Sequence, residues 1–209
     1  MRIIKIEDFK KYKCKILTDE ETDFVLYKTD LKRYGIAEGM EISETQKGLL
    51  FGEILPNRAK ERSLKLLQGK DYTTEEIRRK LQSDGYPHVV VEMTISKLSE
   101  YHLLDDERYA KLYIQSRNAR KSKKVIVIEL QKKGIDKNII FSVLDDIEYN
   151  AENNGDLYCI RNLLHKKKYS DVLSYEEKEK IKAYLFRKGF EIQDILYAMR
   201  NYDFEEGYK

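Results

Sequence analysis

The chain has 209 residues, of which 37% are charged and 41% hydrophobic, and its formal net charge at pH 7 is +3. This balance is typical of an extended helical protein with many residues in water, and the net charge alone does not argue for nucleic-acid binding. Two cysteines far apart in the sequence, Cys14 and Cys159, exclude a disulfide framework and a zinc motif. No stretch approaches the roughly 20 apolar residues of a membrane span, so we expect a soluble, cytoplasmic protein.

Residues 1–55 form the first region, in which apolar and polar residues alternate in three short stretches. Such alternation predicts a small β meander. The stretches are residues 12–16, 24–26 and 40–42. A short helix is expected at residues 29–34, ending at Gly35, and a long helical pattern follows Pro56, with Asn57 as its expected N-cap.

The starts of several later helices carry capping signatures. Two pairs of residues have the spacing of a capping box, in which side chain and backbone satisfy each other's hydrogen bonds. The pairs are Thr73 with Glu76 and Ser174 with Glu177. Between them Ser122 can cap a helix, but Val125 stands where the reciprocal glutamate would be. Two further helices are expected to open at residues 105–106 and near residues 154–156.

One nine-residue phrase occurs three times: an isoleucine, a leucine four residues later, a glycine four residues after that, and then an apolar residue. The copies begin at Ile77, Ile126 and Ile181, and their glycines are Gly85, Gly134 and Gly189. The isoleucine and leucine share one helix face, and the glycine takes the left-handed conformation of a Schellman cap. Apolar residues six, ten and thirteen positions later predict a following helix.

Successive glycines are 49 and 55 residues apart, which leaves room for a third helix in each unit. We therefore predict a mainly α fold: a tandem array of three three-helix repeats, elongated and curved, after a small N-terminal β-rich segment. The expected boundaries are 1–55 for that segment and 56–104, 105–150 and 151–209 for the repeats. Function is expected on an extended surface, because stacked repeats need no deep cavity.

Positive charge gathers between Arg117 and Lys133, where seven basic residues face the single acid Glu129, and a second cluster follows Arg161. We predict that these residues contact an acidic protein surface or phosphate. The alternative is a solvated helix face that keeps a long protein soluble. The candidates are Arg117, Arg120, Lys121, Lys123, Lys124, Lys132, Lys133, Arg161, Lys166, Lys167 and Lys168.

Other residue types give little sign of catalysis. Tyr109 and Tyr113, four apart on a helix, fit core packing better than base stacking. The three histidines are isolated, and adjacent Asp105 and Asp106 suit a helix start better than a catalytic pair. Since there is also no glycine-rich phosphate loop, we expect no metal, no cofactor and no enzyme activity.

Residues 103–114 have an acidic pair followed by an aromatic residue, alanine and a second aromatic residue. This run resembles the RecX family, small bacterial regulators of the recombinase RecA. Residues 75–81 and 129–135 also match, and the resemblance covers roughly residues 58–200. Ser122 stands where the family often has glycine, and the third repeat is only loosely similar. The β-rich extension resembles the form of the family that has an added N-terminal segment.

The resemblance implies a monomeric regulator in DNA repair, homologous recombination and the SOS response. Such proteins bind the RecA filament on single-stranded DNA, inhibit its ATPase and strand exchange, and promote filament disassembly. Weak, non-specific binding of single- or double-stranded DNA is compatible with this. Two alternatives stay open: a helix-turn-helix nucleic-acid-binding module, since each phrase joins two helices by a glycine turn, and a helical-repeat adaptor for other proteins.

Overall fold

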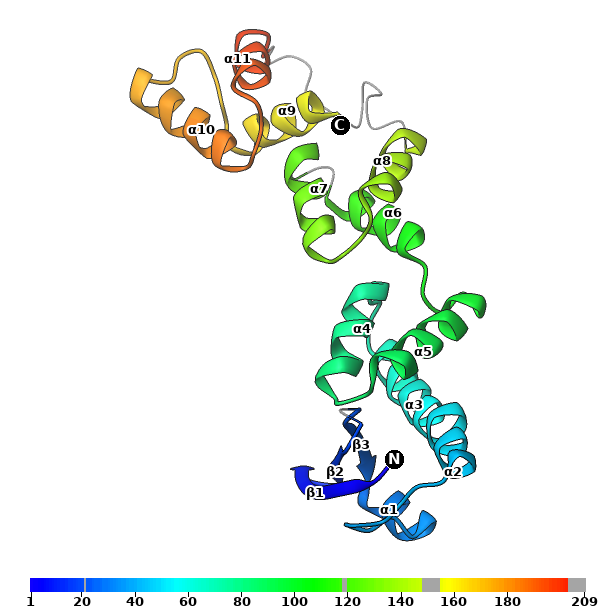
Figure 1. The fold of residues 1–209 in the computed structure, drawn as a ribbon. Coiled ribbons are helices and arrows are strands. Elements are labelled where there is room, and N and C mark those ends of the chain that lie inside the picture. Colours follow the sequence, from blue (N-terminus) through cyan, green and yellow to red (C-terminus); the bar gives the residue numbers. More distant parts are fainter. Residues whose placement is uncertain (21, 118–119, 148–154, 203–209) are drawn as a thin grey trace. The chain divides into compact units, whose positions relative to one another are not determined.

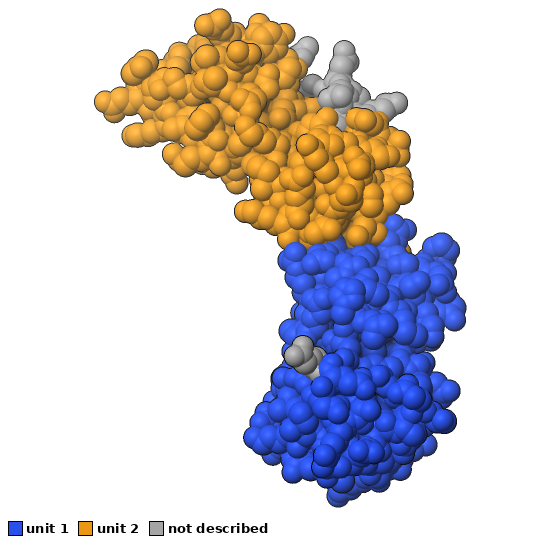
Figure 2. Space-filling view, in the orientation of Figure 1, with its two compact units in different colours: residues 1–105 blue, residues 106–209 orange. Residues whose placement is uncertain are grey.

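The computed structural model describes residues 1–20, 22–117, 120–147 and 155–202. These residues form a mainly helical fold with a small sheet near the N-terminus, as predicted (Figure 1). The chain divides into two compact units, residues 1–105 and 106–209, which Figure 2 colours separately. The elongated, curved form of the array stays a prediction.

Three antiparallel strands form the N-terminal sheet, in the order β1-β2-β3. They are β1 (Ile3–Lys10), β2 (Lys13–Thr18) and β3 (Phe24–Tyr27). The prediction missed β1 and was wrong about a strand at residues 40–42, where only an isolated bridge joins Arg2 to Glu41. The predicted short helix is present as α1 (Lys28–Tyr34), and Gly35 ends it in the left-handed conformation, at a φ of 63°.

A continuous helical stretch crosses Pro56, so the predicted start at Asn57 was wrong. Its parts are α2 (Glu44–Leu49), the π-helical segment η1 (Leu50–Ile54) and α3 (Leu55–Leu67). Ser43 caps the stretch and forms a capping box with Gln46. Proline cannot donate the usual helical hydrogen bond, and the wider π turn just before it accommodates the missing bond. The proline therefore marks a change of helical register rather than a break.

The remaining helices form three successive sets, as predicted. Repeat 1 consists of α3, α4 (Thr74–Ser83) and α5 (His88–Glu100). Repeat 2 consists of α6 (Asp106–Arg117), α7 (Lys123–Lys132) and α8 (Lys137–Asp146). Repeat 3 consists of α9 (Asp156–Lys166), α10 (Tyr175–Arg187) and α11 (Ile192–Arg200). Both predicted capping boxes and the Ser122 cap are present.

The three glycines of the repeated phrase end α4, α7 and α10. Gly85, Gly134 and Gly189 have φ angles of 84°, 84° and 89°, a region in which only glycine is free of strain. In each copy the residue after the glycine is buried, and its N–H donates to the carbonyl oxygen of the phrase leucine, at 3.1, 3.2 and 3.4 Å. The Schellman caps predicted from the sequence are therefore confirmed.

Buried apolar residues form three clusters rather than one core. The first contains residues of the sheet, such as Ile3, together with residues of repeat 1, so the sheet and repeat 1 share a core. Repeats 2 and 3 each have their own. The boundaries at residues 55 and 104 stay a proposal, and the one at residue 150 lies outside the described residues.

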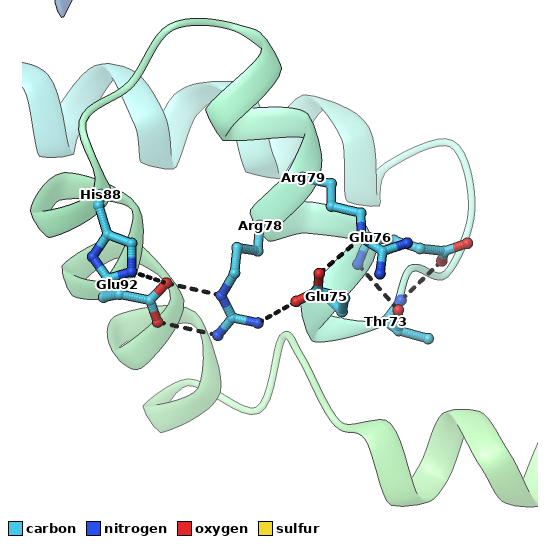
Figure 3. A network of polar contacts seen from close by, with 7 residues as sticks. All are labelled: Thr73, Glu75, Glu76, Arg78, Arg79, His88 and Glu92. Atoms are coloured by element: carbon cyan, nitrogen blue, oxygen red, sulfur yellow. Dashed lines mark hydrogen bonds and ion pairs between the residues drawn. The ribbon is translucent and has the colours of Figure 1, made fainter. Parts of the chain in front are cut away.

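An arginine joins the two helices that meet at the first glycine turn (Figure 3). Arg78 on α4 binds both oxygens of Glu92 on α5, at 2.8 and 3.1 Å, and binds Glu75 at 2.7 Å. The hydrogen bond from Arg78 holds the pKa of Glu92 below its usual value. In the same helix Glu76 completes the capping box with Thr73. Much of the motif at residues 75–81 thus serves to fix this helix pair.

Candidate functional site

The predicted basic residues of unit 2 fall into separate groups rather than one patch. One group surrounds two tyrosines on α6, a second begins α7, and a third lies on α9 and at its end. Two more, Arg120 and Lys132, stand just before α7 and at its last residue.

The first group covers the tyrosine pair of α6. The rings of Tyr109 and Tyr113 stack with centroids 6.3 Å apart and planes 14° from parallel. Both pack against the core of repeat 2, as predicted. The Lys133 ammonium lies 5.4 and 6.0 Å from the two ring centroids, and the Arg117 guanidinium lies 5.6 Å from that of Tyr113. These cation–π contacts hold the two cations against the ring surfaces.

Glu129, the single acid of the basic segment, sits within this group. It accepts a hydrogen bond from the Tyr113 hydroxyl at 2.9 Å and forms an ion pair with Lys121. Burial raises the pKa of Glu129, but the hydrogen bonds from Lys121 and Tyr113 outweigh that effect and lower it. Glu129 therefore stays ionised near neutral pH and compensates the charge of Lys121.

The second group lies at the start of α7 and faces repeat 3. The Lys123 N–H donates to Asp156 at 2.9 Å, and the Lys124 ammonium pairs with Glu191 at 3.2 Å. The Ser122 hydroxyl donates to the Lys188 carbonyl oxygen at 3.5 Å. This end of α7 therefore helps to hold repeats 2 and 3 together.

The third group belongs to α9. Arg161 is half-buried, whereas Lys166, Lys167 and Lys168 are exposed at the helix end. Cations at a helix C-terminus stabilise the helix dipole, which gives them a structural role. Lys167 also lies 4.6 Å from the ring centroid of Tyr184. At 1.5 Å per residue, these lysines are about 15 Å along α9 from its first residue, where α7 makes contact.

Arg120 and Lys132 are the exposed predicted residues that adjoin α7. Both are exposed, and neither has a carboxylate partner among the residues that the structure describes. Charge without an internal partner is what a surface for acidic side chains or phosphate needs. We therefore take Arg120, which precedes α7, and Lys132, its last residue, as the candidate contact residues of repeat 2.

Chemically reactive groups are few in the described part of the chain. No three histidine, cysteine or acidic side chains gather there to hold a metal ion. Both cysteines are buried, and burial raises the pKa of the Cys159 thiol to about 12. Within the same residues, no helix combines the length and apolar character needed to cross a membrane.

A further concentration of cations lies outside the predicted set, on the N-terminal hairpin. Lys10, Lys11 and Lys13 flank Tyr12 at the turn between β1 and β2. In the sequence, three lysines around a tyrosine were the signal for this group. It was missed because these residues were assigned only to a strand. Helix α3 adds Arg62 to the same region.

These features define a class: a helical-repeat protein that exposes cationic side chains on its helices. Family models described as "RecX, first three-helix domain" and "RecX, second three-helix domain" match residues 59–98 and 105–144. A protein named "Regulatory protein RecX" from Caldanaerobacter subterraneus subsp. tengcongensis is 34% identical over 199 residues, covering 95% of this chain and 96% of the relative. The chain belongs to the RecX family.

Two further comparisons agree. A protein of the same name from Finegoldia magna is 34% identical over 196 residues, covering 91% of this chain and 94% of the relative. A solved structure described as "Crystal structure of regulatory protein RecX" matches with a TM-score of 0.61 at 23% identity, covering 96% of this chain and 99% of that one. At that identity the structural match supports the fold alone.

Proposed function

We propose that this chain is a regulator of the RecA recombinase that acts by binding the RecA filament on single-stranded DNA. It inhibits ATP hydrolysis and strand exchange and promotes filament disassembly, acting in the cytoplasm as a monomer without catalysis of its own. The observation that carries the proposal is the family membership, which rests on similarity over 95% of the chain. We infer RecA as the partner from the name of the relatives, which are called regulatory proteins, and from the resemblance found in the sequence.

The surface of repeat 2 suits a repeating partner such as a filament. Arg120 and Lys132 have no carboxylate partner in the part of the chain that the structure describes. Several weak contacts of such cations multiply when they meet a regular lattice. Exposed charge contributes little per contact, so affinity would come from the number of protomers touched.

The helix-turn-helix alternative requires α5 or α8 to enter a DNA groove. On α8 the exposed side chains of Asp145 and Asp146 face water, and on α5 Glu92 already binds Arg78. Phosphate repels helices with such acidic positions. These observations favour a protein partner for the glycine-turn helices.

The test is binding to preformed RecA filaments, measured by co-sedimentation or by interferometry. Reversing both charges in Arg120→Glu/Lys132→Glu should weaken binding by about tenfold, which corresponds to about 1.4 kcal/mol. The matched control is Lys180→Glu/Arg187→Glu on α10, which makes the same change in net charge at exposed positions outside the candidate set. Equal binding by the two variants would show that this surface is not the contact, and no filament binding by the folded wild-type chain would reject the function.

A further inference from the structure

A hollow of about 360 Å³ lies in unit 1, between the turn that joins β1 to β2 and helix α3. We call it the N-terminal groove. Lys10, Lys11 and Lys13 line it from the hairpin, and Arg62 and Lys65 line it from the helix. The lining comes from segments far apart in the sequence, so the groove exists only in the folded chain.

Only two carboxylates line the groove with these five cations, and both are already engaged. Asp84 binds Lys10 and, at 2.7 Å, Arg62. Glu61 pairs with Arg58 at 3.0 Å. The cations with no ion-pair partner in the described part of the chain are Lys11, Lys13 and Lys65. The groove therefore keeps an excess of three positive charges.

Lys13 is unusual because it is a buried cation, with only 8% of its surface exposed. Its ammonium lies 5.0 Å from the ring centroid of Tyr27 and 5.2 Å from that of Tyr86. Burial lowers the pKa of Lys13, and the negative charge of Asp84 offsets this only in part. Cation–π contacts compensate a buried charge incompletely, so an anion entering the groove would be strongly favoured.

Tyr12 supplies a second kind of contact at the rim of the groove. It sits in the hairpin turn with 64% of its surface exposed, and the Lys11 ammonium lies 5.3 Å from its ring centroid. An exposed aromatic ring beside lysines matches the way in which proteins hold single-stranded nucleic acid, with cations along the backbone and rings against bases. An acidic peptide would satisfy the charges but would leave the exposed ring without a role.

We propose that the N-terminal groove binds single-stranded DNA directly, with Lys11, Lys13 and Lys65 on the phosphates and Tyr12 stacked on a base. This contact requires neither a recombinase nor the basic residues of unit 2. It gives the sheet a function beyond covering one end of repeat 1. The proposal does not rest on the proposed regulatory function, and its test contains no recombinase.

The test is fluorescence anisotropy of a labelled oligothymidylate with the full chain across a salt series. The variant Lys11→Glu/Lys65→Glu should weaken binding by about tenfold or more and reduce the slope of log affinity against log salt by about two. Tyr12→Ser should weaken binding several-fold and leave the salt slope unchanged, because stacking releases no counterions. The matched control Lys32→Glu/Lys97→Glu reverses exposed cations of the same unit outside the groove, and should bind within about twofold of wild type.

All variants are also made with Arg120→Glu/Lys132→Glu in the background, which should weaken any binding through repeat 2. Circular dichroism and thermal unfolding confirm that each variant folds. The proposal fails if the groove variant and its control bind alike in that background. It also fails if poly-glutamate of equal charge displaces the oligonucleotide as well as unlabelled oligothymidylate does while Tyr12→Ser has no effect, since the groove would then be a surface for acidic protein.

Discussion

The glycine turns at Gly85 and Gly189 pack against different kinds of element, a strand and a helix, through the same type of contact. A Cβ added at Gly85 would overlap Cγ2 of Val25 from strand β3, and one added at Gly189 would overlap Cγ2 of Val125 from helix α7. In both cases a valine from the preceding part of the chain packs onto the turn. At these two copies the repeated phrase therefore marks a docking point as well as a helix end. The sheet packs on the turn of repeat 1, and repeat 2 packs on the turn of repeat 3.

The difference between the two turns lies in the residue before the glycine. Asp84 binds Lys10 of the sheet and Arg62 of α3. At the other turn the Lys188 carbonyl oxygen accepts a hydrogen bond from Ser122, and the Lys188 ammonium lies 5.6 Å from the ring centroid of Tyr184. The apolar contact, a valine packed on the glycine, is thus the same at both turns. The polar contacts differ, because they depend on the neighbouring element.

The largest effects should come from filling the glycine positions. Gly85→Ala and Gly189→Ala should each lower the free energy of unfolding by about 2–4 kcal/mol, because they add left-handed strain and a steric overlap. Gly35→Ala is the control: its φ is 63° but no atom lies within 4 Å of the added Cβ, so only the strain of about 1 kcal/mol applies. Urea unfolding measures all three, and equal losses would contradict the docking account.

The next effect concerns the polar half of the first turn. Asp84→Asn should lower the free energy of unfolding by about 1–2 kcal/mol near neutral pH, since the side chain is only 8% exposed but its partners are half in water. Burial raises the pKa of Asp84, yet the hydrogen bonds from Lys10 and Arg62 outweigh burial and lower it.

A lowered pKa fixes the sign of the pH dependence. The stabilisation by Asp84 is fully present above the ordinary aspartate pKa and is lost as pH falls through the lower folded value. Stability curves of the wild-type chain and Asp84→Asn should therefore converge in acid. Curves that stay parallel down to the acid limit would show that the carboxylate charge has no part in this docking point.

A smaller effect is expected at Ser122, which is fully buried, caps α7 and lies beside the second turn. Ser122→Ala should cost about 1 kcal/mol in unfolding free energy, whereas Ser122→Gly should cost only a few tenths, because glycine is tolerated as an N-cap. Thermal or urea unfolding distinguishes them. A larger loss for glycine than for alanine would mean that the hydroxyl does not act as a cap.

The smallest effect is expected for the exposed ion pair of the second turn. Lys124 and Glu191 are 67% and 63% exposed, so Glu191→Lys should change the free energy of unfolding by less than about 1 kcal/mol. High salt should remove that change, and the swapped pair Lys124→Glu/Glu191→Lys should restore it at low salt. A larger loss that persists in salt would indicate a packing role instead.

Local signals explain what could be predicted of the fold. The phrase that ends at Gly85 fixes a helix face and a cap within nine residues, and the structure confirms it in all three copies. Strand β1 was missed because its pairing depends on β2 rather than on its own pattern. Pro56 was read as a break because the π turn before it leaves no local signature.

The candidate surface was harder to predict because some of its basic residues pair with acids that are far away in the sequence. The sequence shows the basic segment, but Glu191 reaches Lys124 across 67 residues. The opposite happens in the N-terminal groove, where Lys11 and Lys65 line one hollow although no charge run joins them. Contacts between residues far apart in the sequence therefore decide which cations remain free to bind a partner.

Single-stranded-DNA-dependent ATP hydrolysis tests the proposed regulation of the RecA filament most directly. RecA of the same organism is assembled on DNA, and the chain is added well below one copy per RecA protomer. The account predicts a steep loss of hydrolysis at such ratios, because action on a filament affects many protomers at once. Unchanged hydrolysis even with equimolar, correctly folded protein would contradict the claim.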